Sequence, residues 1–155
     1  MMNGFQRTYA PDEVRAEIWL SIVHGVRGYV FFPQVVAGSD PSNDGTPADV
    51  AAEITKVNTF VTQLANVLQG AINPPEIKAT APAPLQAGWR NAPTGMYSFV
   101  VNPVATSQAA TIALTGTGNA TIATVLNENR AVSISAGTIT DTFAAFTTHV
   151  CVVAK

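Results

Sequence analysis

The sequence contains little charge and almost no cysteine. Only 12% of its 155 residues are charged, with 8 basic and 10 acidic residues, whereas about a quarter is usual. No stripe of Lys and Arg could neutralise phosphates, so the composition excludes a nucleic-acid partner. The single cysteine, Cys151, cannot form a disulfide within the chain,. We expect it to be a buried, unreactive thiol.

Long hydrophobic runs are absent as well. The uncharged apolar stretches fall far short of the roughly 20 residues that a membrane span needs, so we expect no membrane partner. Residues 1–7 lack the apolar core of a secretory signal,, and the compartment stays open. Hydrophobic residues nevertheless make up 47% of the chain. That share is ample for a buried core and excludes a disordered chain.

The charges are unevenly distributed, which indicates two parts. Residues 1–78 hold five of the basic and eight of the acidic residues, whereas the remainder is rich in Thr, Ala, Val and Gly. Prolines cluster just after residue 72, and prolines at this density end helices and favour extended chain,. We therefore predict a first part over residues 1–72 and a second over residues 74–155.

The first part has the pattern of two helices around one buried strand. Pro11 and the acidic residues after it start a predicted helix over 11–24,. A continuous apolar run over 28–33 is typical of a strand covered on both faces,. Apolar residues spaced by three and four then predict a helix over 47–69,. Such a stripe also suits a coiled coil, but beside a buried strand it favours packing on a sheet.

The second part changes to a period of two. Tyr97, Phe99 and Val101 fall on one face of a predicted strand, and Ile112 and Leu114 mark another. Further short strands are predicted over residues 121–126, 131–134 and 149–154, separated by glycine-containing turns. Short strands at regular spacing predict an antiparallel β-sandwich. The fold class expected for the whole chain is therefore α+β, a helical part followed by a small sandwich.

In this order the elements resemble the end of a TIM-barrel glycoside hydrolase. Residues 7–17 and 24–32 are similar to its seventh helix and eighth strand, and residues 44–68 to its last loop and helix. Residues 95–102 and 140–150 resemble the small C-terminal β-sandwich of those enzymes. The ordered combination covers nearly the whole chain and carries more weight than any one motif.

The resemblance implies that most of a barrel is missing from this chain. A barrel has eight parallel strands, and glycoside hydrolysis needs two carboxylates that flank the scissile bond. In the family, glutamates at the ends of the fourth and seventh strands supply them, and both would precede Met1. We therefore expect no catalytic residue here and no glycosidase activity of the chain alone.

Candidate sites other than catalytic ones are few. Trp89 is a candidate platform for a sugar ring, and the candidate contacts in the loop after the predicted strand are Gln34, Asp40 and Asp44. These aspartates are more often turn formers than functional groups. His24 and His149 have no Cys or carboxylate at metal-ligand spacing,. We expect no metal site and no cofactor.

A lone barrel strand would leave its apolar edges uncovered. The strand could join the sandwich, pair with another copy, or meet barrel strands from a complementing chain, and self-association is the expected solution. Two functional classes stay open. In the first, the chain is the C-terminal part of a carbohydrate-active hydrolase, and its sandwich is a structural buttress. In the second, it is a freestanding module that binds glycan or protein.

Overall fold

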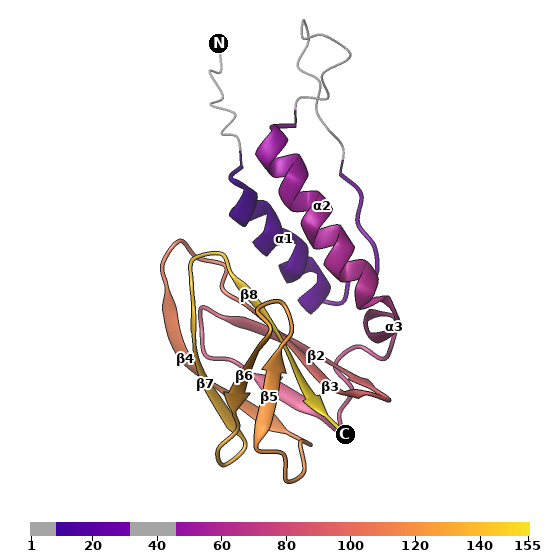
Figure 1. Cartoon of the computed structure of the whole chain (residues 1–155), viewed down its shortest axis with the longest axis vertical. Coiled ribbons are helices and arrows are strands. Elements are labelled where there is room, and N and C mark those ends of the chain that lie inside the picture. The colour runs from indigo at the N-terminus through magenta and orange to yellow at the C-terminus, as the bar shows by residue number, and fades with distance from the viewer. Residues whose placement is uncertain (1–8, 32–45) are drawn as a thin grey trace, which may run out of the picture.

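The computed structural model describes residues 9–31 and 46–155. Within these ranges the chain forms a helical layer and two antiparallel sheets, which confirms the predicted α+β class (Figure 1). The helices are α1 (Pro11–Val23), α2 (Ala48–Gln63) and α3 (Ala65–Leu68). The strands are β1 (Lys78–Thr80), β2 (Gln86–Ala92), β3 (Gly95–Val101), β4 (Gln108–Thr115), β5 (Ile122–Val125), β6 (Arg130–Ser133), β7 (Thr138–Phe143) and β8 (Thr148–Ala154).

The sandwich consists of a sheet of three strands and a sheet of five. The smaller sheet has the order β1-β4-β7 and the larger the order β2-β3-β8-β5-β6, with every neighbouring pair antiparallel. One apolar core lies between the sheets and contains Met96, Val100 and Ile112. The predicted antiparallel sandwich is confirmed.

A second core lies on the outer face of the larger sheet. Tyr97, Phe99 and Val101 of β3 pack there against α1 and α2, through Trp19 of α1 and Val57 of α2 among others. Both faces of β3 are therefore covered, and all seven of its residues are buried. The molecule has three layers, with the larger sheet in the middle (Figure 1).

The sequence of α1 explains where it starts and which face it buries. Pro11 suits the first turn because it needs no hydrogen-bond donor there, and the Ala10 N–H donates to Glu13 Oε2 at 2.9 Å. Val14, Ile18 and Ile22 recur at helical spacing and are buried. The helix predicted over 11–24 is thus confirmed to within one residue.

The prediction of a buried strand over residues 28–33 is wrong for residues 28–31, and residues 32 and 33 lie outside the described ranges. Residues 28–31 form no strand, and the side chains of Val30 and Phe31 are 75% and 43% exposed. An apolar run becomes a buried strand only where neighbouring strands supply hydrogen bonds and cover. All strands that the structure describes lie between residues 78 and 154, and none of them pairs with residues 28–31.

The helix predicted over 47–69 is present as two pieces. It begins at Ala48, with Pro47 as the N-cap residue, and it is interrupted at Leu64 before α3. No helix in the described ranges is long and apolar enough to cross a membrane.

Arg90 of β2 ties the helical layer to the sandwich. The side chain is 1% exposed, and its Nη2 donates to the Ile22 carbonyl oxygen near the end of α1 at 3.2 Å. Its Nη1 donates to the Trp89 carbonyl oxygen at 2.8 Å, and its guanidinium carbon lies 5.9 Å from the Phe99 ring centre. Burial, with the nearby charge of Arg27, lowers the pKa of Arg90. The buried cation is therefore held by one carbonyl oxygen at the C-terminal end of α1 and by another within β2,.

Candidate functional site

The candidate contacts chosen from the sequence do not gather into one site. Gln34, Asp40 and Asp44 lie outside the described residues. Trp89 lies on β2, where it is half-buried, packs against the core between the sheets, and donates from Nε1 to the Pro74 carbonyl oxygen at 3.0 Å. Only part of its ring surface is left to receive a sugar.

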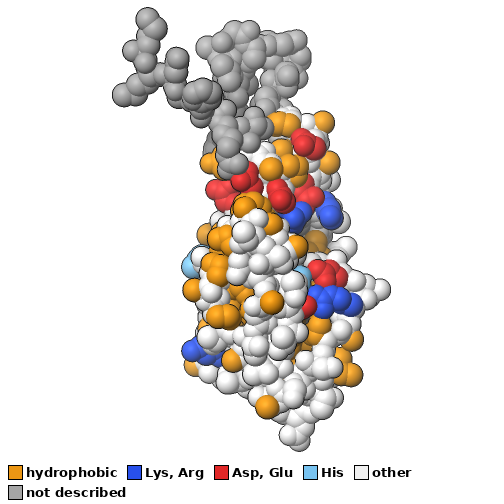
Figure 2. Space-filling model, turned by 90° about the vertical axis from the view of Figure 1, so that its left-hand side faces the viewer, with side chains coloured by type: hydrophobic (Ala, Val, Ile, Leu, Met, Phe, Trp, Pro, Cys, Tyr) orange, Lys and Arg blue, Asp and Glu red, His pale blue; other side chains and the backbone are white. Residues whose placement is uncertain are grey.

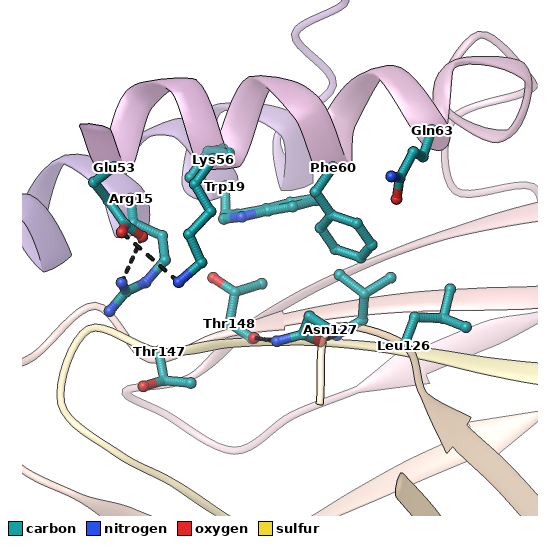
Figure 3. A pocket seen from close by; sticks show the side chains of 12 residues that line it. Arg15, Trp19, Glu53, Lys56, Phe60, Gln63, Leu126, Asn127, Thr147 and Thr148 are labelled. Atoms are coloured by element: carbon teal, nitrogen blue, oxygen red, sulfur yellow. Dashed lines mark hydrogen bonds and ion pairs between the residues drawn. The ribbon is translucent and has the colours of Figure 1, made fainter. Parts of the chain in front are cut away.

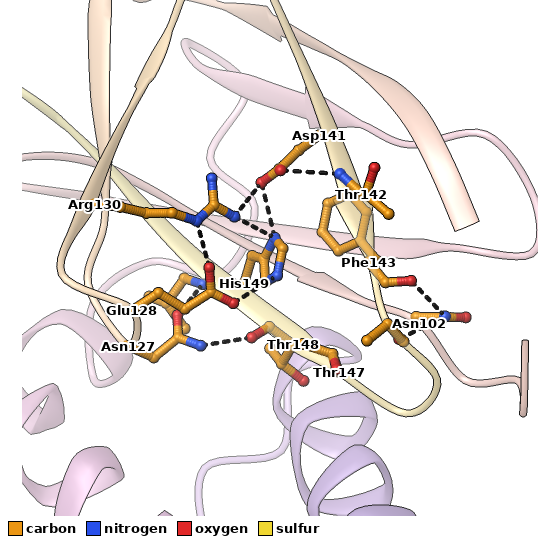
Figure 4. Close-up of polar contacts among 12 residues, drawn as sticks. Asn102, Asn127, Glu128, Arg130, Asp141, Thr142, Phe143, Thr147, Thr148 and His149 are labelled. Atoms are coloured by element: carbon orange, nitrogen blue, oxygen red, sulfur yellow. Dashed lines mark hydrogen bonds and ion pairs between the residues drawn. The ribbon is translucent and has the colours of Figure 1, made fainter. Parts of the chain in front are cut away.

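A connected group of four polar side chains centres on His149 of β8 (Figure 4). The histidine is 2% exposed and stacks on Phe143, with 4.3 Å between ring centres. Its Nδ1 lies 3.0 Å from Asp141 Oδ2, and its Nε2 lies 2.9 Å from Glu128 Oε1. Arg130 contacts both carboxylates. We call these four residues (Glu128, Arg130, Asp141 and His149) the His149 cluster.

The His149 cluster joins the two sheets electrostatically. Asp141 belongs to β7 of the smaller sheet, whereas Arg130 and His149 belong to β6 and β8 of the larger one. Burial by itself raises the pKa of Asp141, but hydrogen bonds from Arg130 and the Thr142 N–H, with the charges of His149 and Arg130, bring that pKa below its usual range. The hydrogen bond with Asp141 in turn raises the pKa of Arg130.

The His149 cluster is suited to stabilising the fold rather than to binding a metal or acting as an acid catalyst. The two carboxylates lie on opposite ring nitrogens of His149, so the three side chains cannot converge on one ion, and the described residues include no group of His, Cys, Asp or Glu arranged for a metal. A general acid at neutral pH needs a raised pKa, and the pKa of Asp141 is lowered.

Replacing Asp141 by Asn tests the structural role. Because folding lowers the pKa of Asp141, the ionised carboxylate stabilises the native state above the unfolded value of about 3.9, and this contribution disappears as pH falls through the folded pKa,. Asp141→Asn should lower the free energy of unfolding at pH 7 by about 1–3 kcal/mol and flatten its decline in acid. Urea unfolding at several pH values measures both effects.

Glu17→Gln is the matched control, because Glu17 is exposed on α1. The control should leave the acid dependence of stability unchanged. An Asp141→Asn variant that loses stability in acid as steeply as the unchanged chain would contradict the role given to this carboxylate.

Cys151 adds no reactive group. It is 5% exposed in the core between the sheets, and burial, followed by the charge of Asp141, raises its pKa to about 12. The thiol therefore stays protonated at neutral pH and is a poor nucleophile. The expectation that Cys151 is buried is confirmed, and the raised pKa agrees with the expectation of an unreactive thiol.

A groove of about 410 Å³ lies between the helical layer and the larger sheet, at the end of the sheet where β8 begins (Figure 3). We call it the α2 groove, because α2 forms its roof in that view. Its apolar lining residues are Trp19, Val57, Phe60, Leu126 and Val150, and its polar ones are Arg15, Glu53, Lys56, Gln63, Asn127, Thr147 and Thr148.

One end of the α2 groove is charged, and Figure 2 shows acidic and basic side chains close together on the helical layer. Arg15 Nη1 lies 2.7 Å from Glu53 Oε1, and Lys56 Nζ lies 3.8 Å from Glu53 Oε2. At the base, Asn127 Nδ2 donates to the Thr148 carbonyl oxygen at 2.8 Å, and Asn127 Oδ1 accepts from the Val150 N–H at 3.0 Å. Both polar ends of the Asn127 amide therefore fix the backbone of β8.

Sequence reasoning missed both the His149 cluster and the α2 groove. A signal existed for the cluster, because residues 79–155 contain only five charged side chains and three of them surround His149. No sequence signal marked the groove, since its walls come from α1, α2, β8 and the segment after β5.

Comparisons with known proteins give no assignment. No family model matches the chain, and no curated protein matches it.

Proposed function

We propose that this chain is the C-terminal part of a carbohydrate-active glycoside hydrolase and is non-catalytic by itself. Its sandwich would support barrel strands and helices that another polypeptide segment supplies. The order of α1, an apolar segment, α2 and a β-sandwich supports the proposal, because the resemblance places a barrel strand between two such helices.

The exposed apolar segment after α1 carries the proposal. Val30 is 75% and Phe31 43% exposed, which is unusual for large apolar neighbours on a protein surface,. Tyr29 lies beside them, 5.6 Å from Phe31 between ring centres, and its hydroxyl donates to Asn58 of α2. Tyr29 and Val61 also line a hollow of about 470 Å³ against α2. Strands or side chains from another polypeptide would cover this segment.

The described carboxylates support the absence of catalysis. A glycosidase needs one protonated and one ionised carboxyl group facing a cleft across the scissile bond. Glu53, in the α2 groove, is held by Arg15 and Lys56, whereas Glu128 and Asp141 are held by Arg130 and His149. Burial by itself raises the pKa of Asp141, but its hydrogen bonds from Arg130 and the Thr142 N–H lower that pKa, so this carboxyl group is not suited to act as the acid,.

Self-association through residues 29–31 is the expected behaviour of the isolated chain, because copies can cover one another's apolar segments. Light scattering at micromolar concentration should give a discrete oligomer. Val30→Asp should shift the mass to that of a monomer, since it places a charge in the shared surface. Ile122→Asp is the matched control, because Ile122 is 59% exposed on the sandwich, and it should leave the oligomer intact.

The same preparations test the absence of catalysis with a panel of aryl glycosides. No hydrolysis above the uncatalysed rate is expected from either variant or from the unchanged chain. Measurable hydrolysis that disappears in Asp40→Asn or Asp44→Asn would overturn the proposal. A strictly monomeric unchanged chain would contradict the role given to Val30 and Phe31.

A second candidate function is a module that binds glycan, and the α2 groove favours it. The groove combines an aromatic and aliphatic lining with a few polar groups at its edges, which is the usual make-up of a small-molecule site. Retention on an insoluble polysaccharide tests this function independently of catalysis.

A further inference from the structure

Thr148 places an unpartnered hydroxyl in the α2 groove. The residue is 3% exposed, and its Oγ1 has no hydrogen-bond partner among the described residues. In Figure 3 its hydroxyl is directed into the groove, towards α2. A buried hydroxyl without a partner costs free energy, so the groove favours an occupant that can bond to it.

The charges at one end of the groove indicate the chemistry of the ligand that would bind there. Arg15 and Lys56 carry two positive charges there, and Glu53 carries one negative charge, which leaves one positive charge in excess. The whole chain, by contrast, has a net charge of −2. The Lys56 side chain is 77% exposed and, like Thr148, belongs to the lining of the groove (Figure 3). An ammonium and a hydroxyl that line the same groove favour a carboxylate as the ligand group,.

The rest of the groove suits a sugar ring. Beyond Lys56 along α2, Phe60 projects towards Leu126, and both side chains are half-buried. Phe60 also packs at 5.8 Å from Trp19 between ring centres, which fixes its position. Gln63 presents an amide one turn further along α2 (Figure 3). An apolar surface between an anion site and an amide matches a ring that carries a carboxylate at one end and hydroxyls at the other.

We propose that the α2 groove binds a sugar acid, with its carboxylate on Lys56 and Thr148 and its ring on Phe60 and Leu126. The volume of about 410 Å³ accommodates a ligand of one or two sugar units,. This inference rests on the glycan-binding function proposed above. It is independent of the proposed hydrolase origin, because binding requires neither oligomer nor barrel.

The test is a titration of the purified chain with D-glucuronate at low salt, followed by amide chemical shifts in NMR spectra. A Kd of about 1 mM is expected for a ligand of this size, with the largest shifts around Lys56, Leu126 and Thr148. D-Glucose, which lacks the carboxylate, should bind at least about tenfold more weakly. Cyclohexanecarboxylate, which lacks the hydroxyls, should also bind more weakly than glucuronate.

Two variants distinguish a ligand site from a structural feature. Lys56→Met keeps the aliphatic stem and should weaken glucuronate binding about tenfold, whereas Lys78→Met, at an exposed lysine of β1, should not. Thr148→Val keeps the shape of the side chain and removes its hydroxyl. It should weaken glucuronate binding while leaving the melting temperature equal or higher, because the lost hydroxyl had no partner,.

Each other outcome overturns the proposal. If glucose bound as tightly as glucuronate, the groove would not recognise a carboxylate. If cyclohexanecarboxylate bound as tightly as glucuronate, the groove would not recognise the sugar hydroxyls. Unchanged glucuronate binding by Thr148→Val, together with a lower melting temperature, would show that the hydroxyl serves the fold through water. Absence of shifts around the groove would refute the site, and the light-scattering and hydrolysis results would stand unaffected.

Discussion

Phe99→Ala is expected to lower the free energy of unfolding by about 3–5 kcal/mol. The ring is fully buried, stacks on Trp19 at 5.9 Å between ring centres, and lies beside the Arg90 guanidinium. Truncation leaves a cavity between the helical layer and the larger sheet, and it also uncovers a buried cation. Because small domains are stable by only about 5–15 kcal/mol, this loss is a large share of the total.

Urea unfolding followed by circular dichroism and tryptophan fluorescence measures the effect of Phe99→Ala. Phe99→Leu, which fills much of the same volume, should lose less, about 1–2 kcal/mol, and remains informative if the alanine variant does not fold. Ile122→Ala is the surface control, at 59% exposure, and should change stability by less than about 0.5 kcal/mol,. A loss below about 1 kcal/mol for Phe99→Ala would refute the central role of this residue.

Gly95→Ala is expected to cost about 3 kcal/mol or more, or to prevent folding. Gly95 begins β3 with a φ of +154°, and a Cβ there would lie 2.3 Å from the Val153 carbonyl oxygen of β8. Because that oxygen belongs to the backbone of a neighbouring strand, no side-chain rearrangement relieves the contact. The pairing of β3 with β8 would have to open at this end.

Gly118→Ala separates backbone strain from this collision. Gly118 has a φ of +60°, and a Cβ there would meet no atom within 4 Å. Gly118→Ala should therefore lower the free energy of unfolding by only about 1–2 kcal/mol, which is the strain of the left-handed conformation. Melting temperatures of the two variants provide the comparison, and similar losses would show that the contact with Val153 is relieved at little cost.

Periodic elements with one buried face could be predicted from sequence. Val14, Ile18 and Ile22 indicated α1, and Tyr97 and Phe99 indicated β3, because each set repeats at the spacing of its element,. These patterns depend only on local geometry and on a single core. They also led to the correct α+β class and to the antiparallel sandwich.

Elements whose burial depends on distant contacts could not be predicted in this way. The β2 strand contains Gly88 and Arg90, neither of which is typical of a buried strand, and the acceptors of the buried Arg90 include a carbonyl oxygen of α1 that is distant in the sequence. The apolar residues 28–31 suggested a strand, yet a strand needs neighbours that this part of the chain does not meet. Thr148 of β8 and Lys56 of α2 are far apart in the sequence and line the same groove only in the folded chain.

Arg90 has a consequence for how the molecule can be divided or recombined. A boundary near residue 73 is visible in the sequence, yet cutting there would remove the Ile22 carbonyl oxygen and expose the Phe99 face of the larger sheet. The guanidinium would then lack one of its acceptors beside an uncovered apolar surface. A graft of the sandwich onto another protein must therefore bring a helix end to the same place. Because these contacts cross the boundary, we expect the two parts to unfold together as one cooperative unit.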